Sequence, residues 1–235
     1  MITFQNVHKS YKKEVPVFKD LNIEIHPGEF VILTGAPGSG KTTFLKLILN
    51  EESPTGGDVF YEGVDLDKMS GSTLKQYRRD LGAIFQDFKL LPFKTAYENV
   101  AFALEVMGES DEDIFKDTME VLDIVGLTHR KDHFPNELSG GEKQKVAIAR
   151  ALIARPKVIL ADEPTGSLDE ETAKEILQVL QAINSLGTTI VMTTHNERLV
   201  QSAKGARKIG IKEHGVVYDE HKKMDHSVPT KELEI

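Results

Sequence analysis

The sequence predicts an α/β protein with a mostly parallel sheet and an inserted helical subdomain, and three observations support this fold class. Short apolar runs alternate with amphipathic stretches through much of the 235-residue chain, the order that strands and helices have in a parallel sheet. Helical periodicity dominates the middle of the chain, from about residue 87 to about residue 156. Strand patterns then return, so the helical block is expected to interrupt one sheet.

The first part of the chain is expected to consist mainly of strands. Its strand candidates either alternate apolar and polar side chains or are wholly apolar, which are the patterns of half-exposed and buried strands. These candidates are residues 2–7, 17–25, 30–33, 59–61 and 81–85. A helix with a wide apolar face is expected to begin near Gly40.

Helices are predicted for the middle block, at residues 95–107, 111–125 and 140–154. The second has a favourable start, because Ser110 precedes three acidic residues and the helix dipole stabilises acids in the first turn.

The last third is predicted to complete the sheet. Its elements are a strand at 158–161, an amphipathic helix at 170–186, a strand at 188–193, and a hairpin at 209–217 that turns across residues 213–215. A single domain is expected over residues 1–218. Its core comprises residues 1–86 and 157–218, its helical subdomain residues 87–156, and a polar tail follows at 219–235.

Composition limits the function classes. The chain has no cysteine, which excludes disulfides and thiolate metal sites, and its net charge of -8 argues against binding nucleic acid through overall charge. Its N-terminus lacks the pattern of a secretory signal, and no apolar run approaches the roughly 20 residues that cross a bilayer. A cytoplasmic protein is expected, with any membrane role provided through a partner.

Residues 35–42 match the phosphate-binding pattern GxxxxGK[ST], between a predicted strand and a predicted helix. In such a loop the backbone N–H groups and the positive end of the helix surround phosphate oxygens. Lys41 is expected to contact the β- and γ-phosphates and Thr42 to bind Mg²⁺. The alternative, a glycine-rich turn with a surface lysine, is disfavoured by this context. The predicted ATP-binding residues here are Gly35, Ala36, Pro37, Gly38, Ser39, Gly40, Lys41, Thr42 and Thr43.

Two acids, Asp162 and Glu163, follow the apolar strand at 158–161. Asp162 is expected to hold Mg²⁺ and Glu163 to orient and polarise the attacking water. Acids at a strand end often only cap the next element, so this prediction depends on the phosphate loop.

The segment Leu138-Ser139-Gly140-Gly141-Glu142 precedes an amphipathic helix. By itself it could be a simple N-cap, with Glu142 in the capping-box position, or an anion cradle at a helix N-terminus. Placed between the phosphate loop and the acidic strand end, LSGGE resembles the signature of ABC-family ATPases. This resemblance covers about residues 1–218. It implies the ABC ATPase fold, a P-loop NTPase (RecA-like) core with an antiparallel β subdomain and an inserted helical subdomain.

The same resemblance assigns further site residues. It implies that Gln86 reaches Mg²⁺ and the water, that His195 contacts the γ-phosphate, and that Asp169 belongs to a loop that crosses to a second subunit. Tyr11 stands where the family stacks an aromatic ring on adenine, although an ordinary edge aromatic is the alternative. The implied catalytic residues are Lys41, Gln86, Glu163 and His195, and the implied Mg²⁺ ligands are Thr42, Gln86 and Asp162.

One chain carries one phosphate loop and one LSGGE segment. The resemblance implies a head-to-tail homodimer in which ATP lies between Lys41 of one chain and the signature of the other. The signature residues expected on the nucleotide are Ser139, Gly140, Gly141 and Glu142.

The run AIFQDFKLLP at residues 83–92, with residues 95–106, resembles the FtsE branch of the family. That branch works at the inner face of the bacterial cell membrane with a membrane protein, FtsX, which transmits ATP-driven motion to cell-wall hydrolases. Phe88, Leu90 and Leu91 are expected to line a groove for a short helix of that partner; packing within the helical subdomain alone is the alternative. Lipoprotein-release and macrolide-export ATPases, LolD- and MacB-like, are the alternative family branches, and a soluble ABC protein of DNA repair or translation is disfavoured.

Overall fold

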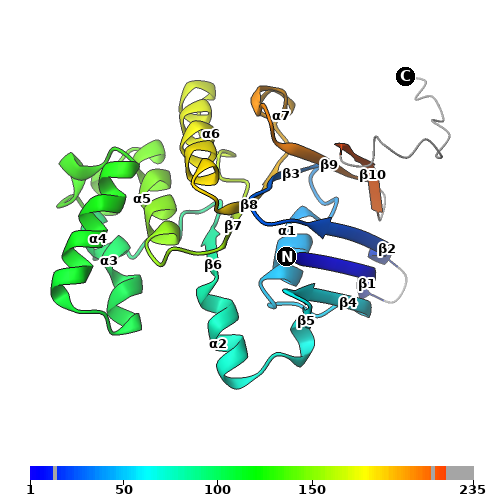
Figure 1. Cartoon of the computed structure of the whole chain (residues 1–235). Coiled ribbons are helices and arrows are strands. Elements are labelled where there is room, and N and C mark those ends of the chain that lie inside the picture. Colours follow the sequence, from blue (N-terminus) through cyan, green and yellow to red (C-terminus); the bar gives the residue numbers. More distant parts are fainter. Residues whose placement is uncertain (13–14, 213–214, 221–235) are drawn as a thin grey trace.

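The protein, seen in a computed structural model that describes residues 1–12, 15–212 and 215–220, is built on two sheets. A four-stranded antiparallel sheet has the order β2-β1-β4-β5, and a six-stranded sheet has the order β10-β9-β3-β8-β7-β6. In the larger sheet β9, β3, β8, β7 and β6 run parallel, and β10 is an antiparallel edge strand. This topology confirms the predicted α/β fold class (Figure 1).

The strands are β1 (Ile2–Lys12), β2 (Val15–Ile25), β3 (Phe30–Thr34), β4 (Gly56–Tyr61), β5 (Val64–Asp65), β6 (Leu81–Ile84), β7 (Val158–Asp162), β8 (Thr189–Thr194), β9 (Arg207–Lys212) and β10 (Gly215–Asp219). The α-helices are α1 (Lys41–Ile48), α2 (Gly71–Arg79), α3 (Ala96–Met107), α4 (Asp111–Ile124), α5 (Gly140–Leu152), α6 (Glu170–Ser185) and α7 (Glu197–Ser202).

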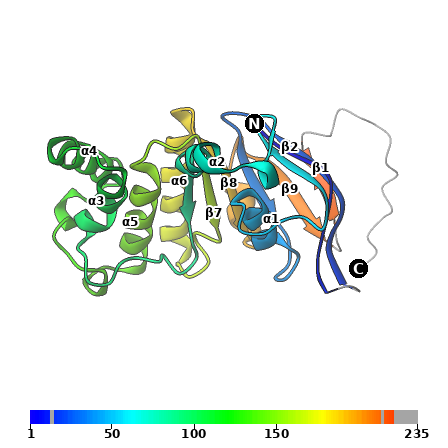
Figure 2. The same cartoon turned by 90° about the horizontal axis from the view of Figure 1, so that it is seen from below.

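The parallel strands are buried on both faces, as their continuous apolar sequences predict. In β3 the side chains of Val31 and Leu33 join one core, which packs α1 and the small sheet against the large sheet. Phe30 and Ile32 point to the opposite face and join a second core with the helices α3 to α7. The small sheet and helix α1 therefore pack on one face of the large sheet, and helices α6 and α7 pack on the other (Figures 1 and 2).

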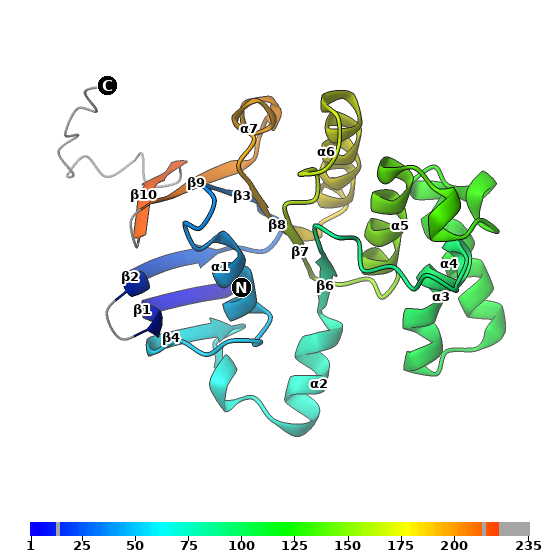
Figure 3. The same cartoon turned by 180° about the vertical axis from the view of Figure 1, so that it is seen from behind.

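Helices α3, α4 and α5 pack together on the far side of α6 from β3 (Figure 3). Capping boxes begin two of them, with Thr95 and Glu98 at α3 and with Ser139 and Glu142 at α5. Helix α5 also contacts β6 and α6, so it connects this block to the large sheet. The domain boundaries at residues 86/87 and 156/157 stay a prediction.

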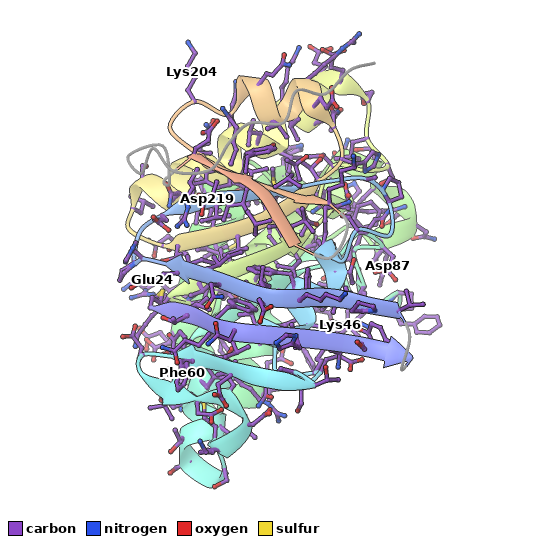
Figure 4. All side chains as sticks on the ribbon, turned by 90° about the vertical axis from the view of Figure 1, so that its right-hand side faces the viewer. Glu24, Lys46, Phe60, Asp87, Lys204 and Asp219 are labelled. Atoms are coloured by element: carbon purple, nitrogen blue, oxygen red, sulfur yellow. The ribbon has the colours of Figure 1, made fainter. Side chains whose placement is uncertain are left out.

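The structure contains elements that the sequence pattern does not predict, among them the short strand β5. Helices α2 and α7 were not predicted, and each is short and largely exposed. Asp219 had been assigned to the polar tail, but it ends β10 and is buried where Arg207 donates to both its oxygens, at 2.9 and 2.8 Å. Figure 4 labels Asp219 on this hairpin. The predicted turn at 213–214 and the tail from residue 221 onward lie outside the described residues.

Within the described ranges, no helix combines the length and the apolar character needed to span a membrane.

Candidate functional site

The candidate site lies where parallel strands end side by side. Thr34 at the end of β3 pairs with Thr194 of β8, and Asp162 at the end of β7 pairs with Thr193 of β8. Ligands of open parallel sheets bind beyond these carboxyl ends. Each strand is followed there by a predicted site residue, since the phosphate loop follows β3, Glu163 follows β7 and His195 follows β8.

The phosphate loop joins β3 to α1 in a conformation that requires glycine. Gly40 has φ of 106°, and a Cβ there would lie 2.7 Å from Val17 Cγ1 and 2.9 Å from Phe18 Cζ. Helix α1 begins at Lys41 without a side-chain cap, so its first N–H groups are available to an anion. The Ser39 hydroxyl of this loop is buried and, in the described part of the chain, has no hydrogen-bond partner.

Lys41, Glu163 and His195 form one charged cluster. Lys41 Nζ lies 3.4 Å from Glu163 Oε1 and donates to the carbonyls of Gly35 and Ala36 at 2.8 and 3.3 Å. His195 Nδ1 donates to Glu163 Oε2 at 3.0 Å. The Lys41 and Glu163 side chains are only 7% and 12% exposed, so this carboxylate bridges the phosphate loop and the end of β8 in a largely dehydrated place.

A residue that the sequence did not single out, Thr193, positions both acids. Its hydroxyl donates to Asp162 Oδ1 at 2.7 Å and accepts from the Glu163 backbone N–H at 2.9 Å. Glu163 itself has φ of 47°, a left-handed conformation uncommon for a residue with a Cβ. The only sequence signal for Thr193 is its position near the end of an apolar strand, and that position does not distinguish it from Thr194.

A hollow of about 490 Å³ opens above this cluster. Tyr11, 55% exposed, lies at its side with its hydroxyl 3.4 Å from Thr43 Oγ1. The hollow is therefore bounded by the phosphate loop, an aromatic ring, an acid and a histidine, and the roles assigned to these residues stay predictions. Its lining residues are Tyr11, Val17, Pro37, Gly38, Gly40, Lys41, Thr42, Thr43, Gln86, Glu163 and His195.

The signature residues and Asp169 do not line this hollow. Ser139 caps α5, where its hydroxyl accepts from the Glu142 N–H and the Glu142 carboxylate accepts from the Ser139 N–H at 2.8 Å. The Ser139 N–H, helped by Arg130, holds the pKa of the Glu142 carboxyl below its ordinary value. The sequence was therefore right about the capping box, and the anion cradle stays a prediction.

The signature packs against the start of α6. A Cβ on Gly141 would lie 2.5 Å from Thr172 Cγ2, so only glycine permits this approach. Asp169 caps α6 by accepting from the N–H groups of Glu171 and Thr172 at 3.1 and 3.0 Å. The hydrogen bond from the Thr172 hydroxyl is the largest cause of the lowered pKa of Asp169, and the two backbone bonds lower it further.

A second hollow, of about 500 Å³, lies between α2, β6, α3 and α5. Phe88, Leu90 and Leu91 do not line this hollow, and all three are half-buried. The groove predicted near them stays a prediction. Leu90 packs against the core of the helical block. The residues that line the hollow are Gly71, Leu74, Lys75, Arg78, Arg79, Leu81, Gly82, Ala83, Ala103, Val106, Met107, Arg150, Ala151 and Ala154.

A family model described as ABC transporter matches residues 18–166, which include the phosphate loop, the signature and both acids. The chain belongs to the ABC transporter family. This membership confirms the resemblance drawn from the LSGGE segment, and it identifies the protein as an ATP-binding ABC ATPase.

Relatives of this ABC ATPase match it over most of their length. The cell division ATP-binding protein FtsE of Bacillus subtilis (strain 168) is 47% identical and covers 94% of this chain and 96% of its own. FtsE of Mycobacterium tuberculosis (strain ATCC 25618 / H37Rv) is 49% identical and covers 87% of this chain and 89% of its own. The predicted resemblance to the FtsE branch is confirmed.

A solved structure, the dimeric post-hydrolysis state of the ATP-binding cassette MJ0796 bound to ADP and Pi, has 38% sequence identity to this ABC ATPase. It covers 93% of this chain and 97% of its own, with a TM-score of 0.83. The ABC ATPase fold predicted from the sequence is confirmed by this likeness.

Proposed function

We propose that this ABC ATPase is the ATP-hydrolysing subunit of an FtsE–FtsX-like complex. Two copies would enclose ATP between them and drive a membrane partner that regulates cell-wall hydrolysis during cell division, at the inner face of the bacterial membrane. The observation that carries the proposal is the high identity, over nearly the whole chain, to proteins named FtsE in distant bacteria.

The residues present fit a magnesium nucleotide. Mg²⁺ prefers oxygen ligands and is usually held by one or two protein groups together with substrate phosphates. Thr42 and Gln86 line the hollow, and Asp162 lies directly before Glu163, which also lines it. When bound, Mg²⁺ would neutralise charge on the β- and γ-phosphates.

Catalysis would begin with a change of partner for Lys41. ATP phosphates in the loop attract the ammonium, which now lies between two carbonyls and Glu163. Released from Lys41, the Glu163 carboxylate can accept a proton from the attacking water. His195, held at 3.0 Å by that carboxylate, would then be placed to contact the γ-phosphate.

A second chain would complete the site. Ser139 lies at the N-terminus of α5, as the phosphate loop lies at that of α1, yet it lines no part of the hollow around Lys41. In a two-fold dimer the phosphate loop of each chain would face the start of α5 of the other chain. ATP would then be bound by Lys41 of one chain and by the signature of its partner, and hydrolysis would release the two chains.

The second hollow is the candidate docking place for the membrane partner. Its charged lining residues are all basic, although the chain as a whole carries a net charge of -8. Beside them lies an apolar wall that includes Ala103, Val106 and Met107 of α3. An amphipathic helix with carboxylates on one side and apolar residues on the other fits this lining. The basic residues are Lys75, Arg78, Arg79 and Arg150.

The deciding experiment is affinity purification of the tagged chain from detergent-solubilised membranes of its own cells, followed by depletion of the copurifying membrane protein. An FtsX-type protein whose depletion blocks division is the expected result. A lipoprotein-release or macrolide-export permease would replace the proposal by that alternative. If no membrane protein copurifies, a partner-driven function is contradicted.

A further inference from the structure

The loop that follows Gln86 has an unusual backbone. Phe88 and Lys89 are consecutive residues with left-handed φ values of 59° and 46°, a conformation that a Cβ disfavours. A turn closed by the Phe88 N–H and the Phe85 carbonyl at 3.1 Å brings Gln86 to the corner before them. A conformation of this kind persists only where neighbouring groups hold it.

Besides the backbone bonds of the turn itself, Arg150 of α5 holds it through its side chain. Its Nη1 donates to the Lys89 carbonyl at 2.6 Å and its Nη2 to the Phe88 carbonyl at 2.9 Å. One guanidinium therefore binds both carbonyls of the left-handed pair, 61 and 62 residues away in sequence. A lysine could not reproduce this geometry, because it lacks the planar fork.

A second anchor fixes the far end of the same loop. Asn99 of α3 is wholly buried; its Oδ1 accepts from the Leu91 N–H at 2.7 Å and its Nδ2 donates to the Lys94 carbonyl at 2.8 Å. The loop is thus attached to α5 and α3, as its path in Figure 3 shows. At its start, Gln86 lines the nucleotide hollow.

Arg150 also lines the second hollow. Burial lowers the pKa of its guanidinium, and the group stays charged at neutral pH, as arginine does in proteins. A carboxylate entering the hollow would compete with the two carbonyls, since an ionised acceptor binds a guanidinium more strongly than a neutral carbonyl does.

We propose that Arg150 is a positioning residue that sets the place of Gln86 in the nucleotide site and reports occupation of the second hollow by a carboxylate-bearing segment of the partner. The part that concerns the partner rests on the proposed function. The part that concerns Gln86 applies to the isolated chain.

The test is a double-mutant cycle on the full chain, measured as kcat and KM for ATP hydrolysis. Because a misplaced catalytic group lowers the rate of the chemical step, Arg150→Lys should lower kcat about tenfold, with KM changed less than about twofold. In a Gln86→Ala background the same change should cost less than about twofold, since residues that act through one another are not additive. Arg155→Lys is the matched control, because Arg155 follows α5, binds Asp117 and lies outside both hollows.

An unchanged kcat in Arg150→Lys, or the same loss in both backgrounds, would overturn the positioning role. If Arg150→Lys does not fold, Arg150→Gln keeps one donor without a buried charge and should show the same non-additivity. In the detergent-purified complex, partner binding should change the wild-type rate but not that of Arg150→Lys. An equal change in both would remove the link to the hollow, whereas absence of any partner would contradict only the proposed function.

Discussion

Replacing Glu163 by glutamine should separate ATP binding from ATP hydrolysis. Glutamine keeps the size of the side chain but cannot take the proton of the attacking water, and loss of a general base costs about a hundred- to ten-thousand-fold in rate. The structure adds a second effect on affinity, because Glu163 Oε1 also lies 3.4 Å from Lys41 Nζ. ATP binding has to draw Lys41 away from this carboxylate.

The size of the second effect follows from the geometry. At 3.4 Å and an effective dielectric constant of about 20, the gross attraction between the two charges is about 5 kcal/mol. Desolvation of two nearly buried groups offsets most of it, and the two carbonyls that also hold Lys41 remain. A net gain of about 1 kcal/mol, or about fivefold tighter ATP binding, is expected when the carboxylate is removed.

The assay is ATP affinity by calorimetry together with steady-state hydrolysis, each with Mg²⁺. Glu175→Gln is the matched control, since Glu175 is a half-exposed acid that binds Lys145 and does not line the nucleotide hollow, and neither quantity should change. Hydrolysis retained in Glu163→Gln would refute the role as base. Weaker ATP binding would refute the competition between Glu163 and ATP for Lys41.

The remaining predictions concern binding, stability and metal. Lys41→Ala should weaken ATP binding by about 2 kcal/mol, as loss of a charged hydrogen bond does, and unchanged affinity in calorimetry would count against the phosphate loop. Burial alone would raise the pKa of Asp80, but hydrogen bonds from Lys157, Gln76 and Tyr61 outweigh it and keep that pKa below its ordinary value. Asp80 therefore stabilises the fold above about pH 4, and this stability is lost as the pH falls through its lowered pKa. Asp80→Asn should lower the free energy of unfolding at pH 7 by about 2 kcal/mol and flatten its acid dependence in urea titrations; parallel curves would contradict this. Chelation by EDTA should abolish hydrolysis and excess Mg²⁺ restore it, whereas activity in EDTA would exclude the proposed metal ligands.

The sequence predicted the parallel strands and the phosphate loop because each has a strong local pattern. Residues 30–33 are wholly apolar, and the glycines after them have a pattern found in few other contexts. Helix α2 was missed because it is only nine residues long and strongly polar, with Tyr77 as its single buried side chain, so few apolar residues mark it as an element of the fold. Contacts between residues that are distant in sequence could not be predicted either. Nothing in the sequence near Arg150 indicates that it binds carbonyls 61 and 62 residues away. For the same reason the tail was begun too early, at Asp219, whose partner Arg207 lies across the hairpin.

The central claim is that the nucleotide site is completed by a second chain. The most direct measurement is the molar mass of Glu163→Gln by light scattering, with ATP·Mg²⁺ and with ADP·Mg²⁺, alongside the same chain carrying Ser139→Arg. A dimer is expected with ATP, a monomer with ADP, and a monomer with either nucleotide once Ser139 is replaced. A monomer of Glu163→Gln at saturating ATP, or an ATP-dependent dimer that persists in the Ser139→Arg chain, would contradict the claim.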